Sequence, residues 1–299
     1  MAVNILEKRA GRQSRHVSRR DDLLQPFLKW AGGKRQLLPE IRKYVPRRYR
    51  LYFEPFVGAA AVLFDTRPRS AVINDANAEL VNCYRVVKRD PEGLIAHLRR
   101  HRNEKKYFYR LRALDRRPSF STLTDIQRAA RIIYLNKTCY NGLFRVNSRG
   151  QFNVPFGSYA NPNIVDEAVI RAASRYLNEA RVEVCNDDFG AAVGAARRGD
   201  FVYFDPPYDP VSGTSSFTGY YLNSFDRDEQ RRLKAVCDDL TRRGCKVLLS
   251  NSATDFIREL YGDASRYSVV EVEAGRNINS VPTGRGKIGE LLIFNNYEV

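Results

Sequence analysis

A short apolar run in the second half of this 299-residue chain stops at two consecutive prolines. The run is Phe201-Val202-Tyr203-Phe204, and Asp205-Pro206-Pro207-Tyr208 follows it directly. Short runs of β-branched and aromatic residues predict a buried strand, and the prolines end it because they cannot donate to a strand ladder. Ligands of open α/β sheets bind at the carboxyl ends of strands. The run therefore predicts a ligand site with a carboxylate, a stiff backbone and an aromatic ring.

The four residues after the run carry groups that suit a flat heterocycle with an amino group. The Asp205 carboxylate and the Pro206 carbonyl can each accept a hydrogen bond from that amino group. The Tyr208 ring offers a face on which a planar base can stack. A second interpretation is that the prolines only end a strand and that Asp205 and Tyr208 are solvated. Four residues do not distinguish the two interpretations.

The charge of the chain indicates a polyanionic partner. Lys and Arg number 50 against 34 Asp and Glu, which gives a formal net charge of +16. The sequence shows no long uncharged apolar stretch and no signal-peptide pattern, so we expect nucleic acid as the partner and not a membrane surface. The five scattered cysteines are expected to be thiols of a reducing cytoplasm. His97 and His101 lie among arginines, which favours a solvated basic helix face over a metal site.

The first part of the chain predicts a basic arm and then a βαβ unit. Residues 1–24 are rich in arginine and are expected to be disordered. A strand at 51–53, a glycine-containing turn, a helix start at 59–64 and a strand at 70–73 follow. The second strand ends at an acidic residue, Asp75. This order suits an adenosyl-type cofactor, because glycine admits a ligand to the backbone and an acid can bind ribose hydroxyls.

The middle of the chain has a different character. Residues 91–114 and 124–137 show helical periodicity with interspersed arginines, and 136–157 has the composition of loops and a hairpin. Arginine, asparagine and aromatic side chains can read base edges, bind phosphates or stack on bases. The alternative is a surface hairpin whose Asn141-Gly142 pair serves turn geometry, and both interpretations can hold together.

Alternation of helices and strands resumes after this segment, which predicts one α/β sheet interrupted by a helical, basic insertion. The further strands are expected at 182–185, 201–204, 246–250, 267–272 and 291–294, and the further helices at 79–88, 166–177, 190–197, 227–242 and 254–261.

Three motifs in this order resemble those of the Dam-type (D12 class, alpha group) DNA adenine-N6 methyltransferases, over residues 26–297. They are Pro26 to Lys34, Glu54-Pro55-Phe56-Val57-Gly58 and Asp205 to Tyr208. The resemblance implies a Rossmann-like class I methyltransferase sheet with an inserted helical, hairpin-containing DNA-recognition domain. Residues 25–78 and 166–299 would then form the catalytic domain, and residues 79–165 the target-recognition domain.

The resemblance also implies a set of site residues. The catalytic residues would be Asp205, Pro206, Pro207 and Tyr208. S-adenosylmethionine would be bound by Trp30, Ala31, Lys34, Glu54, Phe56, Gly58, Asp75, Asp188, Phe189 and Asp205. DNA would be bound by Lys29, Tyr140, Asn141, Leu143, Arg145, Asn147, Asn153 and Pro155.

The activity so implied is methyl transfer from S-adenosylmethionine to N6 of an adenine flipped out of duplex DNA, within GATC, with S-adenosylhomocysteine as product and no metal. Residues 214–223 would form a lid over the flipped base. We expect a monomer in the cytoplasm of a bacterium or of a phage-infected host, with a cognate restriction endonuclease left open as a second partner. The chain departs from the pattern at Ala60, where the family carries a second glycine.

Two alternatives remain at this point. The first is a methyltransferase that acts on RNA or on cytosine N4, since either substrate presents an exocyclic amine to a similar pocket. The second is a non-catalytic DNA-binding protein that has kept the fold. The aspartate at position 205 and the matching recognition loop favour adenine in DNA over the first alternative, and the intact Asp205 to Tyr208 motif argues against the second.

Overall fold

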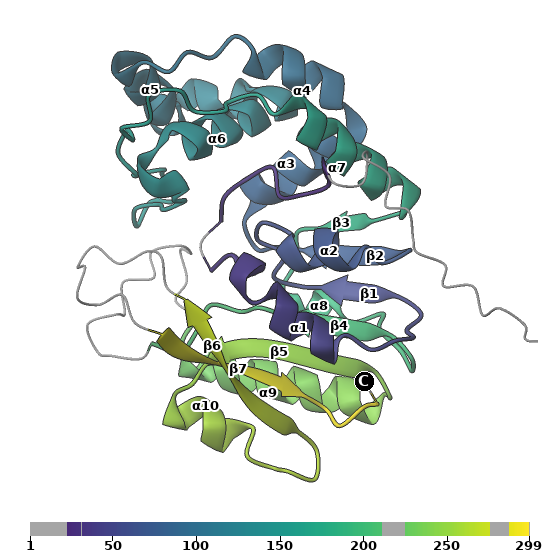
Figure 1. The fold of residues 1–299 in the computed structure, drawn as a ribbon. Coiled ribbons are helices and arrows are strands. Elements are labelled where there is room, and N and C mark those ends of the chain that lie inside the picture. Colours follow the sequence, from purple (N-terminus) through teal and green to yellow (C-terminus); the bar gives the residue numbers. More distant parts are fainter. Residues whose placement is uncertain (1–22, 31, 211–224, 276–286, 299) are drawn as a thin grey trace, which may run out of the picture.

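One mixed sheet forms the centre of the protein (Figure 1). The computed structural model describes residues 23–30, 32–210, 225–275 and 287–298. Within these residues the strand order is β3-β2-β1-β4-β5-β7-β6, with the first five strands parallel and β7 antiparallel to both of its neighbours. The strands are β1 (Tyr52–Glu54), β2 (Ala71–Asn74), β3 (Glu183–Cys185), β4 (Phe201–Phe204), β5 (Lys246–Ser252), β6 (Ser268–Gly275) and β7 (Lys287–Phe294).

The sheet is covered by helices on both faces, as the alternation along β4 shows. Phe201 and Tyr203 point into one hydrophobic core, which α1, α2, α3 and α7 complete. Val202 and Phe204 point into a second core, which α8, α9 and α10 complete. All four side chains are buried, as expected for a central parallel strand. The predicted Rossmann-like α/β class is thereby confirmed.

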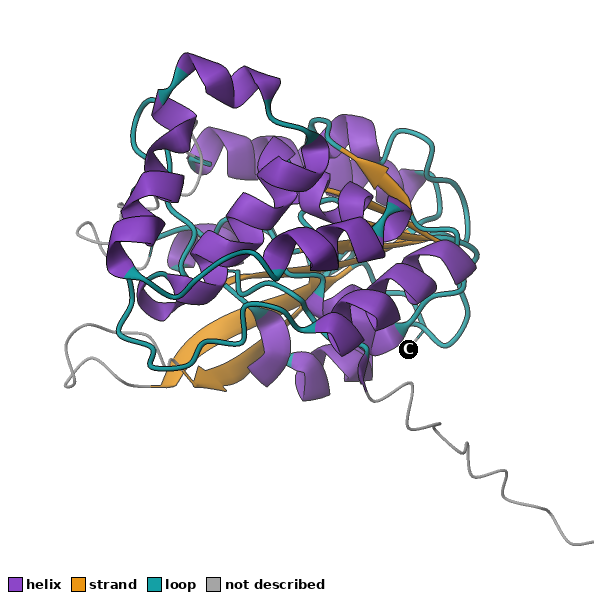
Figure 2. Cartoon of the chain, turned by 90° about the horizontal axis from the view of Figure 1, so that it is seen from above, coloured by secondary structure: helices purple, strands orange, loops and turns teal. Residues whose placement is uncertain are grey.

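Most of the helical content between β2 and β3 lies beyond the β3 edge of the sheet, and from above the helices cover much of the strands (Figure 2). No helix in the described part of the chain is long and apolar enough to cross a membrane. The helices are α1 (Leu38–Tyr44), α2 (Ala61–Thr66), α3 (Ala78–Arg89), α4 (Pro91–Leu98), α5 (Lys105–Arg112), α6 (Asp125–Thr138), α7 (Glu167–Glu179), α8 (Phe189–Ala192), α9 (Arg227–Arg242) and α10 (Asp255–Leu260).

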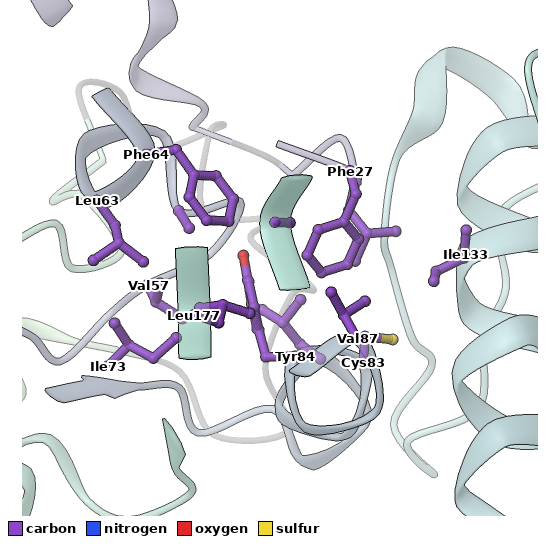
Figure 3. Close-up of a cluster of buried hydrophobic side chains, with 14 of the residues drawn as sticks. Phe27, Val57, Leu63, Phe64, Ile73, Cys83, Tyr84, Val87, Ile133 and Leu177 are labelled. Atoms are coloured by element: carbon purple, nitrogen blue, oxygen red, sulfur yellow. The ribbon is translucent and has the colours of Figure 1, made fainter. Parts of the chain in front are cut away.

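One continuous core joins these helices to the sheet (Figure 3). Ile133 of α6 belongs to the same cluster as Cys83 of α3 and Leu177 of α7. Tyr84 of α3 also donates a hydrogen bond of 2.7 Å to the carbonyl of Gly58, in the turn after β1. The insertion is therefore fixed to the turn after β1 by packing and by this hydrogen bond. The domain limits at residues 78 and 165 remain a prediction.

Two predicted helices are shorter than expected. Residues 91–114 are not one helix, because α4 ends at Leu98 and α5 begins at Lys105. Tertiary hydrogen bonds to the intervening segment replace helical ones: the Tyr134 hydroxyl donates to the Arg102 carbonyl, and the Asn103 side chain donates to the Tyr159 carbonyl. The helix expected at 190–197 is only Phe189–Ala192, and the Asp200 carboxylate accepts from the Arg197 N–H ahead of β4.

The expected solvated face around His101 is also wrong. His101 is half-buried, its Nδ1 lies 2.7 Å from the Tyr107 hydroxyl, and its ring packs 4.8 Å from that of Tyr134. Burial lowers the pKa of His101 to about 4, and the neighbouring His97 adds to the effect. The side chain is therefore a neutral part of the helical packing. All five cysteines are free thiols, as expected.

Candidate active site

The sheet topology brings the turn after β1, which contains Gly58, next to the Asp205 to Tyr208 motif after β4. Strands β1 and β4 are neighbours, with Phe53 opposite Val202, so the residues after both strands meet at one edge of the sheet. Lys34, which begins a 3-10 turn (Lys34–Gln36), completes the meeting point. Its Nζ lies 2.8 Å from Asp205 Oδ1 and 4.7 Å from the centre of the Tyr208 ring. Three distant segments thus form one cluster around the Asp205 carboxylate.

The electrostatics of Asp205 depend on two opposite charges. Burial raises the pKa of Asp205 to about 6, while the Lys34 ammonium opposes this rise and the Glu290 carboxylate adds to it. Glu290 comes from β7, and its Oε2 accepts a hydrogen bond of 2.8 Å from the Tyr208 hydroxyl. Burial therefore sets the raised pKa of Asp205, and two groups from opposite ends of the sequence shift it in opposite directions.

Glu54, the last residue of β1, is a buried acid beside this cluster. Its exposed fraction is 2%, and its Oε2 accepts a hydrogen bond of 2.8 Å from the Tyr52 hydroxyl. Burial raises the pKa of Glu54 to about 8, so the group is mainly neutral at pH 7. Glu54 and Asp205 line one small cavity together with Gly32, Lys34 and Gly58, which shows that all three motifs converge.

The turn after β1 requires glycine at position 58. Gly58 has φ of +46°, and a Cβ there would lie 3.1 Å from Cδ1 of Trp30. The Gly58 N–H donates to Asp75 Oδ2 at 3.1 Å, and the Asn77 N–H donates to Asp75 Oδ1 at 2.9 Å. Asp75 is thus held at the end of β2 next to the turn, as the βαβ interpretation expects. Trp30 is half-buried and stacks on Phe144 at 4.6 Å.

The departure from the family pattern has a visible consequence at Ala60. This residue is fully buried and adopts a left-handed conformation, with φ of 58° and ψ of 35°. A left-handed residue with a Cβ costs about 1–2 kcal/mol relative to glycine. The methyl group is therefore accommodated in the turn before α2, at the cost of backbone strain.

A cavity of about 760 Å³ opens beside the same motifs. A cluster of aromatic rings lies along it, with Phe56 at 5.3 Å from Phe189 and at 5.6 Å from Phe225. Arg232 forms a bidentate ion pair with Asp188, in which its two terminal nitrogens donate to the two carboxylate oxygens at 2.9 and 2.7 Å. This pairing lowers the pKa of Asp188. The volume of this cavity is within the range of small-ligand sites. Further lining residues are Pro55, Asn74, Asn77, Glu79, Val146, Asp187, Pro207 and Glu229.

The residues around the two cavities fit an adenosyl cofactor. Glu54 lines the smaller cavity and Asp188 the larger one, and their carboxyl oxygens can accept from amino and hydroxyl groups. Asp75 accepts from the N–H of Gly58, which lines the smaller cavity. The Phe56 and Phe189 rings pack on each other and can offer an apolar face to a planar base. Gly58 lets a ligand approach the backbone closely. No group of three or more His, Cys, Asp or Glu that could hold a metal occurs in the described ranges. Ala31 and the lid expected at 214–223 lie outside those ranges.

The segment from Tyr140 forms an irregular hairpin. Two isolated bridges join its arms, Cys139 with Phe156 and Val146 with Phe152. Asn141 and Gly142 have φ of +55° and +64°, which confirms their role as turn formers. A Cβ at Gly142 would lie 2.5 Å from Cδ of Lys29, so this turn also packs closely on the first motif.

The predicted DNA-binding side chains of the hairpin differ in their solvent exposure and in their hydrogen bonds. Tyr140 is half exposed at 50%, and Asn141, Pro155 and Lys29 are exposed. Arg145 is exposed and donates from Nε to Asn153 Oδ1 at 2.8 Å. Leu143 is half-buried. Tyr140, Leu143, Pro155 and Lys29 thus lie at or beside the Asn141-Gly142 turn, and Arg145 pairs with the opposite arm of the hairpin.

Asn147 has a structural role within the hairpin. Its Oδ1 accepts from the backbone N–H groups of Arg149 and Gln151, both at 3.0 Å, and its Nδ2 donates to Gln151 Oε1 at 2.9 Å. The carboxamide is thus used inside the hairpin turn.

Sequence reasoning missed Glu290, Gln230 and Asn251, which all touch the motif or its peptide groups. Glu290 had a signal, because it is an acid that directly precedes the apolar run of the strand predicted at 291–294. Asn251 had a weaker one, because it directly follows the strand predicted at 246–250. Gln230 lies in a charged helix and had none.

The chain is similar to known DNA methyltransferases along most of its length. Residues 30–278 match the family described as D12 class N6 adenine-specific DNA methyltransferase. The chain is 46% identical to the type II methyltransferase M1.LlaDCHI of Lactococcus lactis subsp. cremoris, over 91% of this chain and 95% of that protein. It is 40% identical to the type II methyltransferase M.MjaIII of Methanocaldococcus jannaschii, over 91% and 99%. It is 39% identical to the DNA adenine methylase of Serratia marcescens, over 89% and 96%.

Proposed function

Because the chain belongs to the D12 class of N6 adenine-specific DNA methyltransferases, we propose that it methylates an adenine flipped out of duplex DNA, within GATC. The donor that this family implies is S-adenosylmethionine. The observation that carries the proposal is the cluster of Asp205, Lys34 and Tyr208 at the carboxyl end of β4. Asp205 supplies an acceptor for an amino group and Tyr208 a ring face for the base.

The proposed chemistry depends on two acceptors. The Asp205 carboxylate and the Pro206 carbonyl accept the two N6 hydrogens, which directs the nitrogen lone pair away from the adenine ring. When bound, S-adenosylmethionine supplies an electrophilic methyl group whose C–S bond breaks with both electrons going to sulfur. The N6 lone pair forms the new N–C bond, and N6 then releases one proton. Asp205, with its pKa raised to about 6, can take that proton and pass it to solvent.

The two cavities beside the motifs would hold the cofactor. Trp30 and Lys34 would contact it from the first motif, and Glu54 would bind its amino group from β1. Asp75 would accept from the ribose hydroxyls, and Asp188 with Phe189 would bind the adenine ring beside Phe56. Two observations support this assignment: Glu54 lines the smaller cavity at the end of β1, and Asp75, directly after β2, accepts from the N–H of Gly58 in the same lining. The transfer needs no metal, since the sulfonium already carries a good leaving group.

The hairpin is the proposed reader of the DNA sequence. Tyr140 and Asn141 would fill the space that the flipped adenine leaves, and Arg145 would read a base edge. Asn153 supports that role, because its side chain holds the Arg145 guanidinium at 2.8 Å and so limits its rotation. Leu143 and Pro155 would complete the reader, and Lys29 would reach the outer base pair. The net charge of +16 supports binding to the phosphate backbone.

We further propose that the protein acts as a monomer in the cytoplasm, since one active site suffices for one adenine. Two of the relatives carry the name type II methyltransferase, which supports a cognate restriction endonuclease as a partner. Sequencing the genes on either side of this one, and testing any nuclease there for cleavage of unmethylated DNA, examines that proposal.

The decisive experiment is transfer of labelled methyl from S-adenosylmethionine to a duplex with one GATC site, followed by digestion to nucleosides. We expect labelled N6-methyladenine from the GATC duplex and little from a duplex with a scrambled site. Asp205→Ala should abolish transfer and keep duplex affinity within about threefold, while Asp263→Ala at the surface is the matched control. Label on cytosine or on an RNA substrate would establish the first alternative. Tight DNA binding by the wild type without transfer would establish a non-catalytic binding protein.

A further inference from the structure

Two buried carboxamides connect the peptide groups on either side of Tyr208. The Gln230 side chain of α9 donates from Nε2 to the Pro207 carbonyl at 2.9 Å. Its Oε1 accepts from Asn251 Nδ2 at 3.0 Å. Asn251 Oδ1 in turn accepts from the Asp209 N–H at 3.3 Å. The Pro207 carbonyl and the Asp209 N–H are thus joined through two side chains that lie outside the motif.

The two carboxamides are unusual for their surroundings. Gln230 and Asn251 are both fully buried, at 0% exposure, among neighbours such as Leu233 of α9 and Leu249 of β5. A buried carboxamide costs free energy unless its donors and acceptors are paired. An apolar side chain would fill these positions without that cost. Unlike apolar side chains, these amides can form hydrogen bonds with the backbone of the motif.

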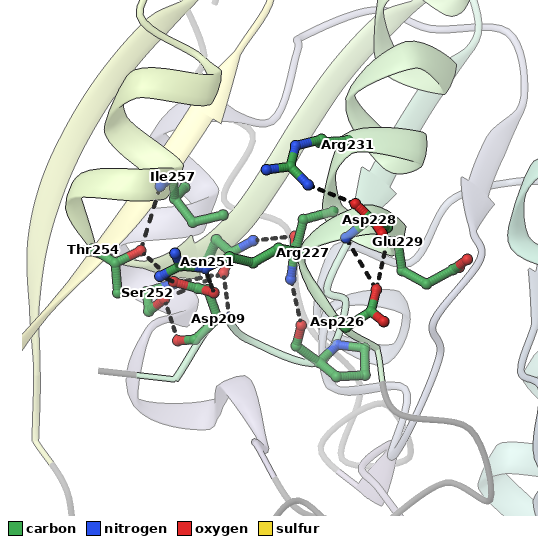
Figure 4. Close-up of polar contacts among 12 residues, drawn as sticks. Asp209, Asp226, Arg227, Asp228, Glu229, Arg231, Asn251, Ser252, Thr254 and Ile257 are labelled. Atoms are coloured by element: carbon green, nitrogen blue, oxygen red, sulfur yellow. Dashed lines mark hydrogen bonds and ion pairs between the residues drawn. The ribbon is translucent and has the colours of Figure 1, made fainter. Parts of the chain in front are cut away.

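The segment after Tyr208 is fixed by the same neighbourhood (Figure 4). The Asp209 carboxylate accepts from Arg227 at 3.1 Å and from the Thr254 hydroxyl at 2.8 Å. The Ser252 hydroxyl donates to the Asp209 carbonyl at 2.7 Å. Strand β5, helix α9 and the start of helix α10 therefore all anchor the residue that follows the motif. Tyr208 has few ways to move once both of its peptide groups are held.

We propose that Gln230 and Asn251 are positioning residues for methyl transfer. They fix the peptide groups that flank Tyr208 and thereby set the ring face on which the adenine stacks and the direction of the Pro206 carbonyl. This inference rests on the proposed function. A misplacement of about 1 Å at a reacting group can cost on the order of a hundredfold in rate, so losing this support should slow the transfer step. Binding of cofactor and of duplex DNA should change little, because neither amide reaches the cavities.

The test is a single-turnover measurement of N6-methyladenine formation by the full-length protein on a GATC duplex. Gln230→Met keeps the length of the side chain and removes both hydrogen bonds. Gln230→Glu keeps the acceptor for Asn251 and removes the donor that faces Pro207. The matched control is Asn295→Ala, which removes another partly buried carboxamide that binds the Val247 N–H and the Cys245 carbonyl near the opposite end of β5.

We expect both Gln230 variants to lower the single-turnover rate by about ten- to a hundredfold while the dissociation constants for S-adenosylmethionine and duplex stay within about threefold. Asn295→Ala should lower the melting temperature and leave the rate within about threefold. If Gln230→Met does not fold, Gln230→Glu and Asn251→Asp give the same comparison. A wild-type rate in these variants, or an equal loss in Asn295→Ala, would overturn the inference. No transfer by the wild type would instead overturn the proposed function.

Discussion

The Lys34 ammonium lies 2.8 Å from the Asp205 carboxylate and 4.7 Å from the centre of the Tyr208 ring. It thus donates to the carboxylate that we propose receives an N6 hydrogen of the target adenine. The carboxylate has two oxygens and can serve both donors at once. The charge on Asp205 is therefore the quantity that links Lys34, the target base and the pH of the reaction.

The first prediction concerns the pH dependence of the wild type. Asp205 must be ionised to accept the N6 hydrogen, and its pKa is raised to about 6. The single-turnover rate should therefore be constant above about pH 7 and fall as the pH drops through 6. Asp205→Asn should show a low rate without this acidic limb. An acidic limb that persists in Asp205→Asn would assign it to another group.

The second prediction concerns the cation. The Lys34 ammonium lowers the pKa of Asp205, so Lys34→Met should raise that pKa and move the acidic limb to higher pH. Lys34 is also a proposed cofactor contact, and the profile must be measured at saturating S-adenosylmethionine. Lys34→Arg is the matched control, because it keeps the positive charge. A limb that stays in place in Lys34→Met would show that the ion pair does not influence Asp205 during turnover.

The third prediction has the opposite sign. The Glu290 carboxylate raises the pKa of Asp205, so Glu290→Gln should move the acidic limb to lower pH. The glutamine can still accept from the Tyr208 hydroxyl, which separates the loss of charge from the loss of the hydrogen bond. Glu271→Gln, which removes an exposed acid on β6, is the control. Movement of the limb in the same direction as in Lys34→Met would contradict this account.

The fourth prediction concerns stability and Glu54. Its pKa is raised from 4.5 to about 8 in the folded protein, so the folded state keeps a proton that the unfolded chain loses. The free energy of unfolding should therefore fall as the pH rises from about 4.5 to 8 and level off above 8. Glu54→Gln should flatten this dependence. Chemical denaturation at several pH values measures both, and equal slopes for the two proteins would show that Glu54 is ionised.

The fifth prediction concerns sequence preference. Arg145→Ala should relax discrimination at one base pair by about 1–3 kcal/mol, measured by methylation of duplexes with single substitutions in GATC. Asn153→Ala should produce a smaller change at the same base pair, because it frees the Arg145 guanidinium. Arg149→Ala, an exposed arginine at the hairpin tip, should weaken binding to all duplexes equally. Relaxation at different base pairs in the first two variants would separate their roles.

The sequence was sufficient for the strands and for their grouping into one sheet. The apolar run before Asp205 became β4, and the predicted strand at 70–73 became β2 with a shift of one residue. Local pattern works here because a buried parallel strand leaves a run of apolar residues in the sequence. The break between α4 and α5 was not predictable from local pattern. The hydrogen bonds that hold the segment between them join Arg102 to Tyr134 and Asn103 to Tyr159, which lie far along the chain.

The same contrast holds for the site. Asp205, Tyr208 and Lys34 belong to motifs, and the structure brings all three together. Glu290 and Gln230 do not belong to a motif, and only the pairing of β7 with β5 and the position of α9 place them beside Tyr208. Residues that support a motif from other elements are set by topology. The motifs in the sequence therefore indicated the residues of the cluster, but not the residues of other elements that hydrogen-bond to them.

The pairing of β1 with β4 also governs the order in which the protein can assemble. The Arg50 side chain binds that of Asp200 at 2.7 Å, 150 residues further along the chain, at the start of these two strands. On the ribosome the whole helical connection emerges before β4 exists, and contacts of such long range close slowly. The nascent chain therefore contains Lys34 and Glu54 long before it contains Asp205. The cluster of Lys34, Asp205 and Tyr208 can form only after β4 has joined β1 at the centre of the sheet.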